Sequence, residues 1–382
     1  RSQFWLVGAA MLLWKHVNVR DEHRELVLAF LLESWRPETP FAILAITGEQ
    51  GSGKSSTHSR LRQLVDPNSI PLRVAPKSVQ DIYVSAANNW VASFENMSNL
   101  NSKMQDALCT LATGGGFAAR KLYSDADESV IEVKRPIIIN GISETATRPD
   151  LLDRVIHLEL QKIDKYARSA VLDDAFEQDR PAILAGMLDV FSSALRFLPG
   201  IHIESPPRMA DLAFLGEAIS QALGERGSFT IAYRQNRARS LGRSIEASPT
   251  ALAILAMVDD VAAWTGTVSQ LKRFLESNYQ QDAEGWPRSP KGLADILRRM
   301  TPAFRELGVE VRFLGHRRDG SYVHIFSSSE NVHEQPSQPS HSNENPFEGD
   351  RVRVVTDVLE ENESLESETM SQKTPSVKEL TI

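Results

Sequence analysis

The sequence predicts an α/β fold built on a parallel β-sheet, followed by a helical region and a winged helix. Three observations support this prediction. Short, continuous apolar runs end at polar or glycine residues, as do strands that are buried on both faces. Helical stretches separate some of these runs, which favours parallel strands joined by crossover helices. After about residue 250 the pattern changes to helices followed by two alternating strands.

Composition limits the class of protein. The chain has 382 residues, 41% of them apolar and 24% charged, which is typical of a globular protein with about two or three domains. Its one cysteine, Cys109, excludes an internal disulfide and suits a reducing, cytoplasmic setting. The apolar run Phe4–Trp14 is too short to span a bilayer, so we expect no membrane partner. Because the chain begins with Arg1, we expect a fragment or processed product without a signal peptide.

The net charge of −8 lies entirely in the C-terminal tail, since residues 328–382 hold 12 acidic and 4 basic side chains. The remaining residues, 1–327, are balanced in charge, which neither requires nor forbids nucleic-acid binding. The tail is rich in Ser, Glu, Asn and Pro, so we expect it to be disordered, with only Val352–Leu359 able to order on a partner.

Residues 1–40 predict helices that end at Arg36-Pro37. Four apolar runs then predict the strands of the sheet: Phe41–Thr47, Trp90–Phe94, Pro136–Ile139 and Val155–Leu160. Between the second and third runs, Phe117–Val133 predicts an inserted β-hairpin with an acidic turn at Asp125–Glu128. After residue 160 the chain turns helical, with one helix expected to start at Asp179 and carry Pro181 in its first turn.

The last predicted domain combines helices with a β-wing. Ser289-Pro290 starts a helix, and the segments Val309–Leu314 and Tyr322–Phe326 alternate apolar and polar residues. Asp319-Gly320 supplies the turn between these two strands. Two helices followed by such a wing are the outline of a winged helix.

A phosphate-binding loop is the strongest motif in the chain. Residues 48–55 match G-x-x-x-x-G-K-[ST] in full, after a predicted strand and before the helical stretch Ser56–Leu64. In such a loop, backbone N–H groups wrap the β-phosphate, Lys54 reaches the β- and γ-phosphates, and the Ser55 hydroxyl completes the Mg²⁺ coordination. We therefore expect Mg²⁺-ATP to be bound by Gly48, Glu49, Gln50, Gly51, Ser52, Gly53, Lys54, Ser55 and Ser56.

Hydrolysis also needs a metal-binding carboxylate and a group that orients water. Glu95 follows the predicted strand Trp90–Phe94 and is the candidate Mg²⁺ ligand beside Ser55. Asn96 stands where many such ATPases place a glutamate base, and an amide cannot accept the proton. Asn96 therefore either positions water or leaves turnover slow; the alternative is a strand that ends in ordinary polar residues.

Two further positions suggest catalysis. Asn140 ends an apolar strand and could reach the γ-phosphate or the attacking water, or it could belong to an ordinary Asn-Gly turn. Arg148 and Arg154 precede the last strand and could enter the nucleotide site of a neighbouring subunit. Alternatively, these arginines pair with Asp150 or Asp153 at a solvated helix start.

The ordered set of motifs resembles an AAA+-type ATPase, and most closely the superfamily 3 helicases and replication-initiator ATPases of phages, plasmids and integrated mobile elements. The resemblance covers about residues 20–327. It implies that Lys54 and Ser55 act as Walker A residues, Glu95 as the Walker B acid and Asn140 as sensor 1. It also implies that Arg148 and Arg154 are arginine fingers.

The resemblance further implies that the hairpin grips DNA through Arg120 and Lys121. Two features depart from the family pattern: Glu95-Asn96 replaces the usual Asp-Glu, and the hairpin turn is acidic. Basic residues of the winged helix are the other candidate DNA contacts, unless they form a solvated face of a packing domain: Arg298, Arg299, Arg317 and Arg318.

The expected domains are a helical segment (1–40), a P-loop core (41–160), a helical lid (161–249), a winged helix (250–327) and the acidic tail (328–382). The leading hypothesis is an ATP-dependent DNA helicase or translocase in the replication of a phage or mobile element, acting as a ring such as a hexamer. The alternative is an ATP-gated DNA-binding assembly or regulatory switch with little or no unwinding. A P-loop kinase for a small metabolite fits poorly, because such an enzyme needs neither a wing nor an arginine from a neighbour.

Overall fold

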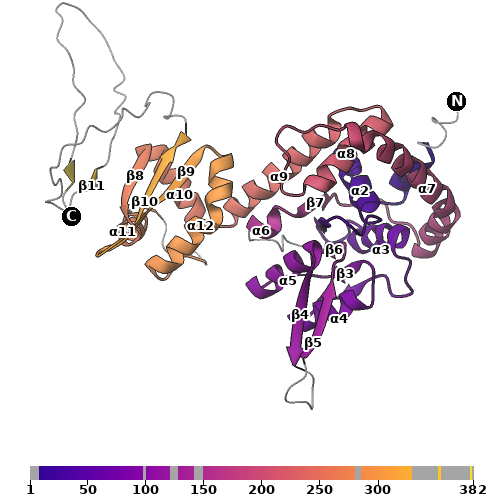
Figure 1. The fold of residues 1–382 in the computed structure, drawn as a ribbon, viewed down its shortest axis with the longest axis horizontal. Helices are drawn as coiled ribbons and strands as arrows, with labels where there is room; N and C mark the ends of the chain where they lie inside the picture. Colours follow the sequence, from indigo (N-terminus) through magenta and orange to yellow (C-terminus); the bar gives the residue numbers. More distant parts are fainter. Residues whose placement is uncertain are drawn as a thin grey trace, which may run out of the picture. The chain divides into compact units, whose positions relative to one another are not determined.

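The computed structural model describes residues 8–97, 100–120, 128–141, 149–279 and 285–328, together with the two short paired strands β11 (Val352–Arg353) and β12 (Glu379–Leu380). The chain divides into two compact units, residues 1–240 and 241–382 (Figure 1). Apart from β11 and β12, the tail for which we expected disorder lies outside the described residues.

The first unit contains a five-stranded parallel sheet, which confirms the predicted α/β core. The strands lie in the order β2-β3-β6-β1-β7. Their bounds are β1 (Ile43–Gly48), β2 (Arg73–Val74), β3 (Ala92–Glu95), β6 (Ile137–Asn140) and β7 (Val155–Leu160). The three central strands carry fully buried residues such as Leu44, Ile46 and Ile138, which explains why the sequence shows continuous apolar runs rather than alternation.

Helices surround this sheet. They are α2 (Asp21–Glu33), α3 (Lys54–Val65), α4 (Val79–Ala87), α5 (Ser102–Thr113), α6 (Pro149–Leu152), α7 (Ser169–Phe197), α8 (Ala210–Leu223) and α9 (Ser228–Glu246), with 3₁₀ turns η1 (Leu12–Lys15) and η2 (Leu198–Gly200). Helices α2, α7 and α8 pack together, and buried side chains from all three belong to one apolar core with β1 and β7. Helix α8 is followed by Gly224, whose left-handed backbone caps its last turn.

Helix α7 differs from its prediction. It starts at Ser169 rather than Asp179, and Pro181 lies inside it rather than in its first turn. A proline removes one backbone hydrogen bond from a helix. The helix continues through it because Phe176 before the proline and Ile183 after it are both buried in the core.

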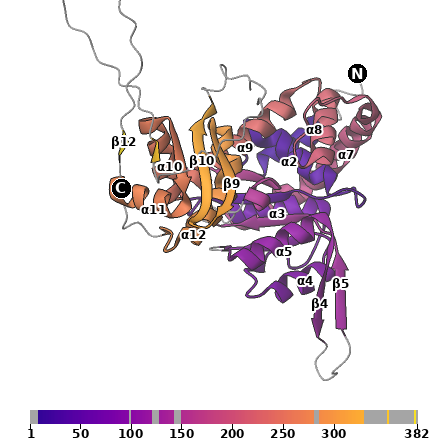
Figure 2. The ribbon, with the colours of Figure 1, turned by 60° about the vertical axis from the view of Figure 1, so that its left-hand side comes forward.

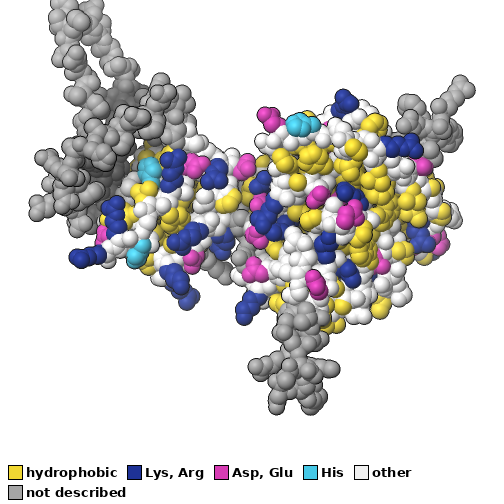
Figure 3. Space-filling model, in the orientation of Figure 1, with side chains coloured by type: hydrophobic (Ala, Val, Ile, Leu, Met, Phe, Trp, Pro, Cys, Tyr) yellow, Lys and Arg dark blue, Asp and Glu magenta, His cyan; other side chains and the backbone are white. Residues whose placement is uncertain are grey.

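Helix α7 also carries apolar side chains on its outer surface. Within the described part of the chain, the segment Ser169–Gly200 alone is long and apolar enough to cross a membrane, by length and composition only. Its exposed apolar residues are Val171, Leu172, Leu184, Leu188 and Leu195. Hydrophobic side chains gather over this part of the unit in Figure 3.

The predicted hairpin is present as β4 (Gly115–Arg120) and β5 (Glu128–Val133), an antiparallel pair inserted between α5 and β6. It extends beside α4 and α5 (Figure 2). Of the predicted acidic turn Asp125–Glu128, residues 125–127 lie outside the described residues, whereas Glu128 is the first residue of β5. Lys121 and the side chain of Arg120 also lie outside the described residues.

In its described residues from 249 to 328, the second unit contains three helices and a three-stranded antiparallel sheet. Its elements are α10 (Pro249–Val261), β8 (Ala263–Thr267), α11 (Val268–Asn278), α12 (Pro290–Glu306), β9 (Val309–Arg317) and β10 (Gly320–Ser327). Ser289 caps α12 as predicted, by accepting a hydrogen bond from the Gly292 N–H. Strand β8 was not predicted, because helices adjoin it directly on both sides and Thr267 is both its last residue and the N-cap of α11.

Candidate functional site

The P-loop connects β1 to α3, and its glycines are required by geometry. Gly53 has φ 75°, a left-handed conformation that starts α3 and that favours glycine. At Gly48 a Cβ atom would lie 2.6 Å from the Leu160 carbonyl oxygen and 2.8 Å from Ser52 Oγ. The loop therefore lies tightly against the end of β7, and its shape depends on the motif that the sequence shows.

Lys54 lies within this loop. Its Nζ donates hydrogen bonds to the carbonyl oxygens of Gly48 (2.6 Å) and Glu49 (2.7 Å), and burial lowers its pKa. Both acceptors are neutral, so the ammonium charge has no carboxylate to give up before it meets a phosphate. The loop also follows a strand and precedes the N-terminus of the 12-residue helix α3, where positive potential favours an anion.

The structure brings Ser55 and Glu95 together. Ser55 lies in the first turn of α3 and Glu95 ends β3, and Ser55 Oγ donates a hydrogen bond of 3.4 Å to Glu95 Oε2. A hydroxyl and a carboxylate are hard oxygen donors, which fit Mg²⁺ held by few protein ligands plus phosphate and water. Among the described residues there is no cluster of three or more His, Cys, Asp or Glu that could hold another metal.

Asn96 follows Glu95 and is exposed, with φ 55°. Asparagine is one of the few residues with a side chain that adopt this left-handed conformation readily, whereas glutamate does not. The backbone therefore gives a physical reason for the departure from the usual Asp-Glu pair, although an amide still cannot serve as a base.

Asn140 ends β6, between β3 and β1, and is 2% exposed. Its side-chain oxygen accepts a hydrogen bond from the Asn96 N–H (2.9 Å), and its carbonyl oxygen accepts one from the Met97 N–H (2.7 Å). Asn140 thus holds the turn after β3 through both its side chain and its main chain.

His58 is a residue that the sequence reasoning missed. It lies on α3, four residues after Lys54, and is fully buried. Its Nδ1 is 2.9 Å from the Asn140 side-chain nitrogen, and its Nε2 is 2.8 Å from Ser93 Oγ. Burial, with the nearby charge of Arg62, lowers the pKa of His58 to about 3. A polar side chain on the buried face of a helix needs a hydrogen-bond partner, and so does Ser93 within an apolar strand. The sequence could therefore have indicated that His58 and Ser93 form a pair.

The N-terminal segment and the connection after β7 form the outer wall of the loop. The Asn18 side-chain amide donates to the carbonyl oxygens of Ser52 (2.9 Å) and Gln161 (2.7 Å). The Tyr166 hydroxyl, on a ring that is 70% exposed, donates to the Gly51 carbonyl oxygen at 3.3 Å. Three segments distant in sequence thus meet at the loop.

Arg154, unlike Lys54, is paired with a carboxylate. It is 8% exposed and pairs with Asp150 at 2.9 Å. Arg208 also pairs with Asp150 (2.7 Å), and Arg237 pairs with Asp153 (2.7 Å). The structure therefore shows the alternative arrangement, an arginine paired at a helix start, although Arg154 is buried rather than solvated.

The remaining predicted site residues are dispersed. Arg148 lies outside the described residues. Arg298, Arg299, Arg317 and Arg318 are all exposed on the second unit. The guanidinium of Arg298 lies over the Phe313 ring (4.6 Å), and that of Arg317 over the Tyr322 ring (4.6 Å).

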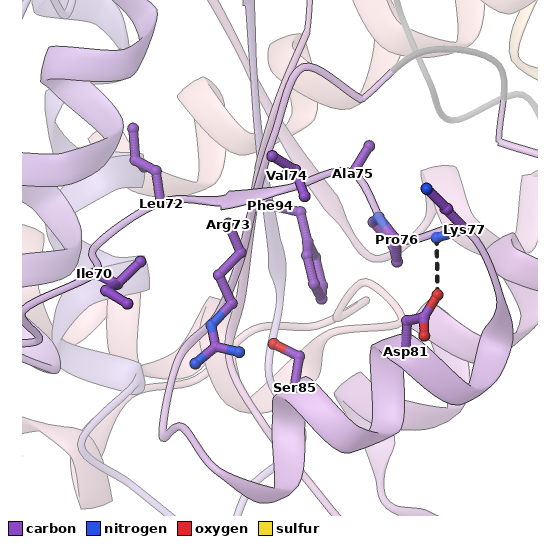
Figure 4. Close-up of a pocket in the computed structure, with 10 residues that line it drawn as sticks. All are labelled: Ile70, Leu72, Arg73, Val74, Ala75, Pro76, Lys77, Asp81, Ser85 and Phe94. Atoms are coloured by element: carbon purple, nitrogen blue, oxygen red, sulfur yellow. Dashed lines mark hydrogen bonds between the residues drawn. The ribbon is translucent and has the colours of Figure 1, made fainter.

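A separate cavity of 530 Å³ lies at the β2 edge of the sheet (Figure 4). It contains no predicted site residue. Its lining includes Arg73, Val74, Lys77, Ser85 and Phe94.

Two protein-family models match the chain. Residues 10–237 match the family described as actinomycete integrative conjugative element replication protein. Residues 250–340 match the family of the C-terminal domain of the same replication protein, RepA. No curated protein matches the chain.

Three solved structures that resemble the chain share little sequence with it. The SCCmec type IV Cch active helicase is 12% identical with a TM-score of 0.40, over 85% of this chain and 67% of that one. The NrS-1 C-terminal region is 10% identical with a TM-score of 0.37, over 84% of this chain and 74% of that one. The JCV helicase, solved with a bound acetamide compound, is 12% identical with a TM-score of 0.30, over 58% of this chain and 60% of that one.

The first family match covers more than half of the chain, includes the whole P-loop and the sheet, and is continued by the C-terminal match. It confirms the resemblance to replication proteins of mobile elements. The chain belongs to the family of replication proteins of actinomycete integrative conjugative elements.

Proposed function

We propose that this chain is a Mg²⁺-dependent ATPase that acts on DNA as a helicase or translocase during replication of its element. The observation that carries the proposal is the edge of the sheet where Lys54 is bonded to neutral carbonyl oxygens and the next residue, Ser55, is bonded to Glu95 at the end of β3. Such an arrangement would supply a phosphate-binding loop and a metal site side by side.

The residues divide the chemistry between them. Lys54 would exchange its carbonyl partners for phosphate oxygens, and Ser55 and Glu95 would hold Mg²⁺, which would supply positive charge to neutralise the phosphates. Asn96, which follows Glu95, and Asn140, which ends the neighbouring strand, are the residues that we propose orient the γ-phosphate or the attacking water. The strand order, the hairpin inserted before β6 and the helices after β7 support an AAA+-type core of the superfamily 3 kind.

The second unit supports a role on DNA. Its order of helix, strand, two helices and a two-stranded wing is that of a winged helix. Arg298 and Arg299 lie on α12, the helix that would face the groove, and Lys and Arg side chains recur over the visible face of this unit (Figure 3). We further propose a cytoplasmic, ring-shaped homo-oligomer, in which Arg148 or Arg154 would serve the nucleotide site of a neighbour.

Asn96 favours one alternative, an ATP-gated DNA-binding assembly. An exposed amide cannot take a proton from water, so ATP would drive assembly and DNA docking with little turnover. DNA-dependent hydrolysis separates the two functions.

The test is steady-state ATP hydrolysis with and without single-stranded DNA. Lys54→Ala should lower turnover at least about 100-fold, because it removes a donor to the developing charge. Lys103→Ala, an exposed lysine on α5, is the matched control and should behave as wild type. Turnover that rises with DNA supports the motor, whereas tight Mg²⁺-ATP binding without turnover supports the assembly. Normal turnover in Lys54→Ala would refute the site.

A further inference from the structure

We infer that His58 is a positioning residue, which sets the orientation of the Asn140 amide and thereby the turn that carries Glu95 and Asn96. The inference rests on the proposed ATPase function and adds a residue that no motif assigns. It is carried by a chain of four hydrogen bonds that starts at the Asn96 N–H and ends at the Pro71 carbonyl.

The first of these hydrogen bonds fixes the orientation of the Asn140 side-chain amide. A backbone N–H can only donate, so the Asn140 atom that faces the Asn96 N–H at 2.9 Å is the amide oxygen. The other end of the amide is then the NH₂ group, which also can only donate. The His58 Nδ1, 2.9 Å away, must therefore be the acceptor.

The last of these hydrogen bonds fixes the tautomer of His58 in the same way. The Pro71 carbonyl can only accept, so the Ser93 hydroxyl donates to it at 2.8 Å. Ser93 Oγ then accepts from His58 Nε2 at 2.8 Å, which places the single imidazole proton on Nε2. Both ends thus impose one tautomer, and a doubly protonated imidazole would turn an N–H against the Asn140 amide.

These hydrogen bonds connect the three elements that carry the proposed site residues. His58 lies one helical turn after Lys54 on α3, Ser93 lies on β3, and Asn140 ends β6. All three side chains are buried, at 0%, 1% and 2% exposure respectively. A movement of α3 when Lys54 meets phosphate therefore reaches Asn140, and through its oxygen the left-handed turn at Asn96.

One consequence concerns Asn140. Its oxygen is bonded to Asn96 and one N–H to His58, so the chain leaves one N–H of the amide unused. Asn140 can therefore approach the nucleotide as a donor, toward a γ-phosphate oxygen, and not as an acceptor that takes a proton from water.

Two substitutions separate the two ends of the imidazole. In His58→Asn the shorter amide lies near the position of Nδ1, so its oxygen can still accept from Asn140. In His58→Gln the amide lies near Nε2 and keeps the bond to Ser93 but not the one to Asn140. Both variants lose the ring, but asparagine is one methylene shorter than glutamine and leaves more space unfilled, so packing alone predicts the larger loss in His58→Asn.

We expect His58→Gln to lower kcat about 10- to 100-fold with little change in the Kd for a fluorescent ATP analogue, because a positioning residue acts on orientation rather than on nucleotide binding. His58→Asn should recover most of that loss. A loss in His58→Asn that equals or exceeds the loss in His58→Gln, or an equal loss of nucleotide binding, would show that the histidine only fills space.

A second measurement is independent of hydrolysis. Hydrogen exchange of the Asn96 amide, followed by NMR, should be at least about 10-fold faster in His58→Gln than in wild type or His58→Asn. If wild type hydrolyses no ATP, the proposed function fails, and the exchange rates still decide the positioning role. Unchanged exchange of Asn96 in His58→Gln would overturn the inference.

Discussion

Two cationic side chains of the first unit, Lys54 and Arg154, have different kinds of hydrogen-bond partner. Lys54 in the P-loop is bonded to the neutral carbonyl oxygens of Gly48 and Glu49. Arg154 is bonded to the carboxylate of Asp150, which Arg208 shares. The first cation can exchange its partners for phosphate at little electrostatic cost, whereas the second must leave an anion behind.

The difference shows which predictions a motif can support. A lysine inside a glycine-rich loop has its partners within six residues, so its role follows from local sequence. Arg154 also has its carboxylate partner, Asp150, only four residues away, but Arg208, which shares that carboxylate, comes from a distant part of the chain that only the fold brings there. To act on a neighbour's nucleotide, Arg154 would have to exchange Asp150 for phosphate.

Lowering the pH should reduce the stability contributed by His58 more than that contributed by the cluster around Arg154. This is the largest effect that we expect. The pKa of His58 lies at about 3, below the ordinary value of 6.5, so the unfolded chain binds a proton that the folded chain excludes. The stability it contributes is complete above pH 6.5 and falls as the pH drops toward 3. By pH 4 the loss is about 3 kcal/mol.

Urea unfolding at pH 7 and pH 4 measures this loss, with His58→Gln as the variant that lacks it. The arginine cluster should contribute little to the difference over this range. Although burial acts the other way, the hydrogen bond and charge of Arg154 hold the pKa of Asp150 below its ordinary value, so that carboxylate stays ionised. The same pH dependence in wild type and His58→Gln would contradict this prediction.

Glu95→Gln tests the metal side of the P-loop region. The substitution keeps the size of the side chain and removes the charge that faces Ser55, so kcat should fall about 100-fold. Added Mg²⁺ should restore only part of the loss. Glu204→Gln, an exposed residue of the same unit, is the matched control. Full activity of Glu95→Gln at low Mg²⁺ would exclude Glu95 as a ligand.

Arg154→Ala tests the other region. Since Arg154 is buried and bonded to Asp150, its loss should lower the free energy of unfolding by about 1.5 kcal/mol, with Arg208 left to partner Asp150. If it also abolishes turnover but not ATP binding, mixing it with Lys54→Ala decides between roles. Restored turnover in the mixture means that Arg154 acts on a neighbour, and no restoration means that its role is structural.

Tyr166→Phe should have the smallest effect. It removes one hydroxyl that donates to the Gly51 carbonyl at 3.3 Å and leaves the exposed ring in place. We expect the Kd for ATP to change by less than about 5-fold, since one neutral hydrogen bond contributes about 1 kcal/mol. A larger change would show that the P-loop depends on the segment after β7 more than its bond lengths suggest.

The sequence predicted the parts of the molecule whose causes are local. The buried strands, the P-loop and the cap at Ser289 each depend on residues close together in the chain. Ser55 and Glu95 could also be placed together, because both were expected at the carboxyl edge of a parallel sheet. Their roles remain predictions until turnover is measured.

What the sequence did not reveal depends on distant partners. The helix through Pro181 is stabilised by core contacts on both sides of the proline, and β2 is two residues long and visible only through its pairing with β3. His58 acquires its meaning from Ser93 and Asn140, which lie 35 and 82 residues away. No window of neighbouring residues contains that information.

The hydrogen bonds of Asn18 have a practical consequence for anyone who shortens this protein. One amide joins the P-loop to the connection after β7, and it comes from a segment that precedes the first strand of the sheet. A fragment cut at residue 40 would retain every motif residue and lose this clamp. A shortened chain that is meant to keep these contacts of the P-loop therefore has to extend beyond the motif and include Asn18.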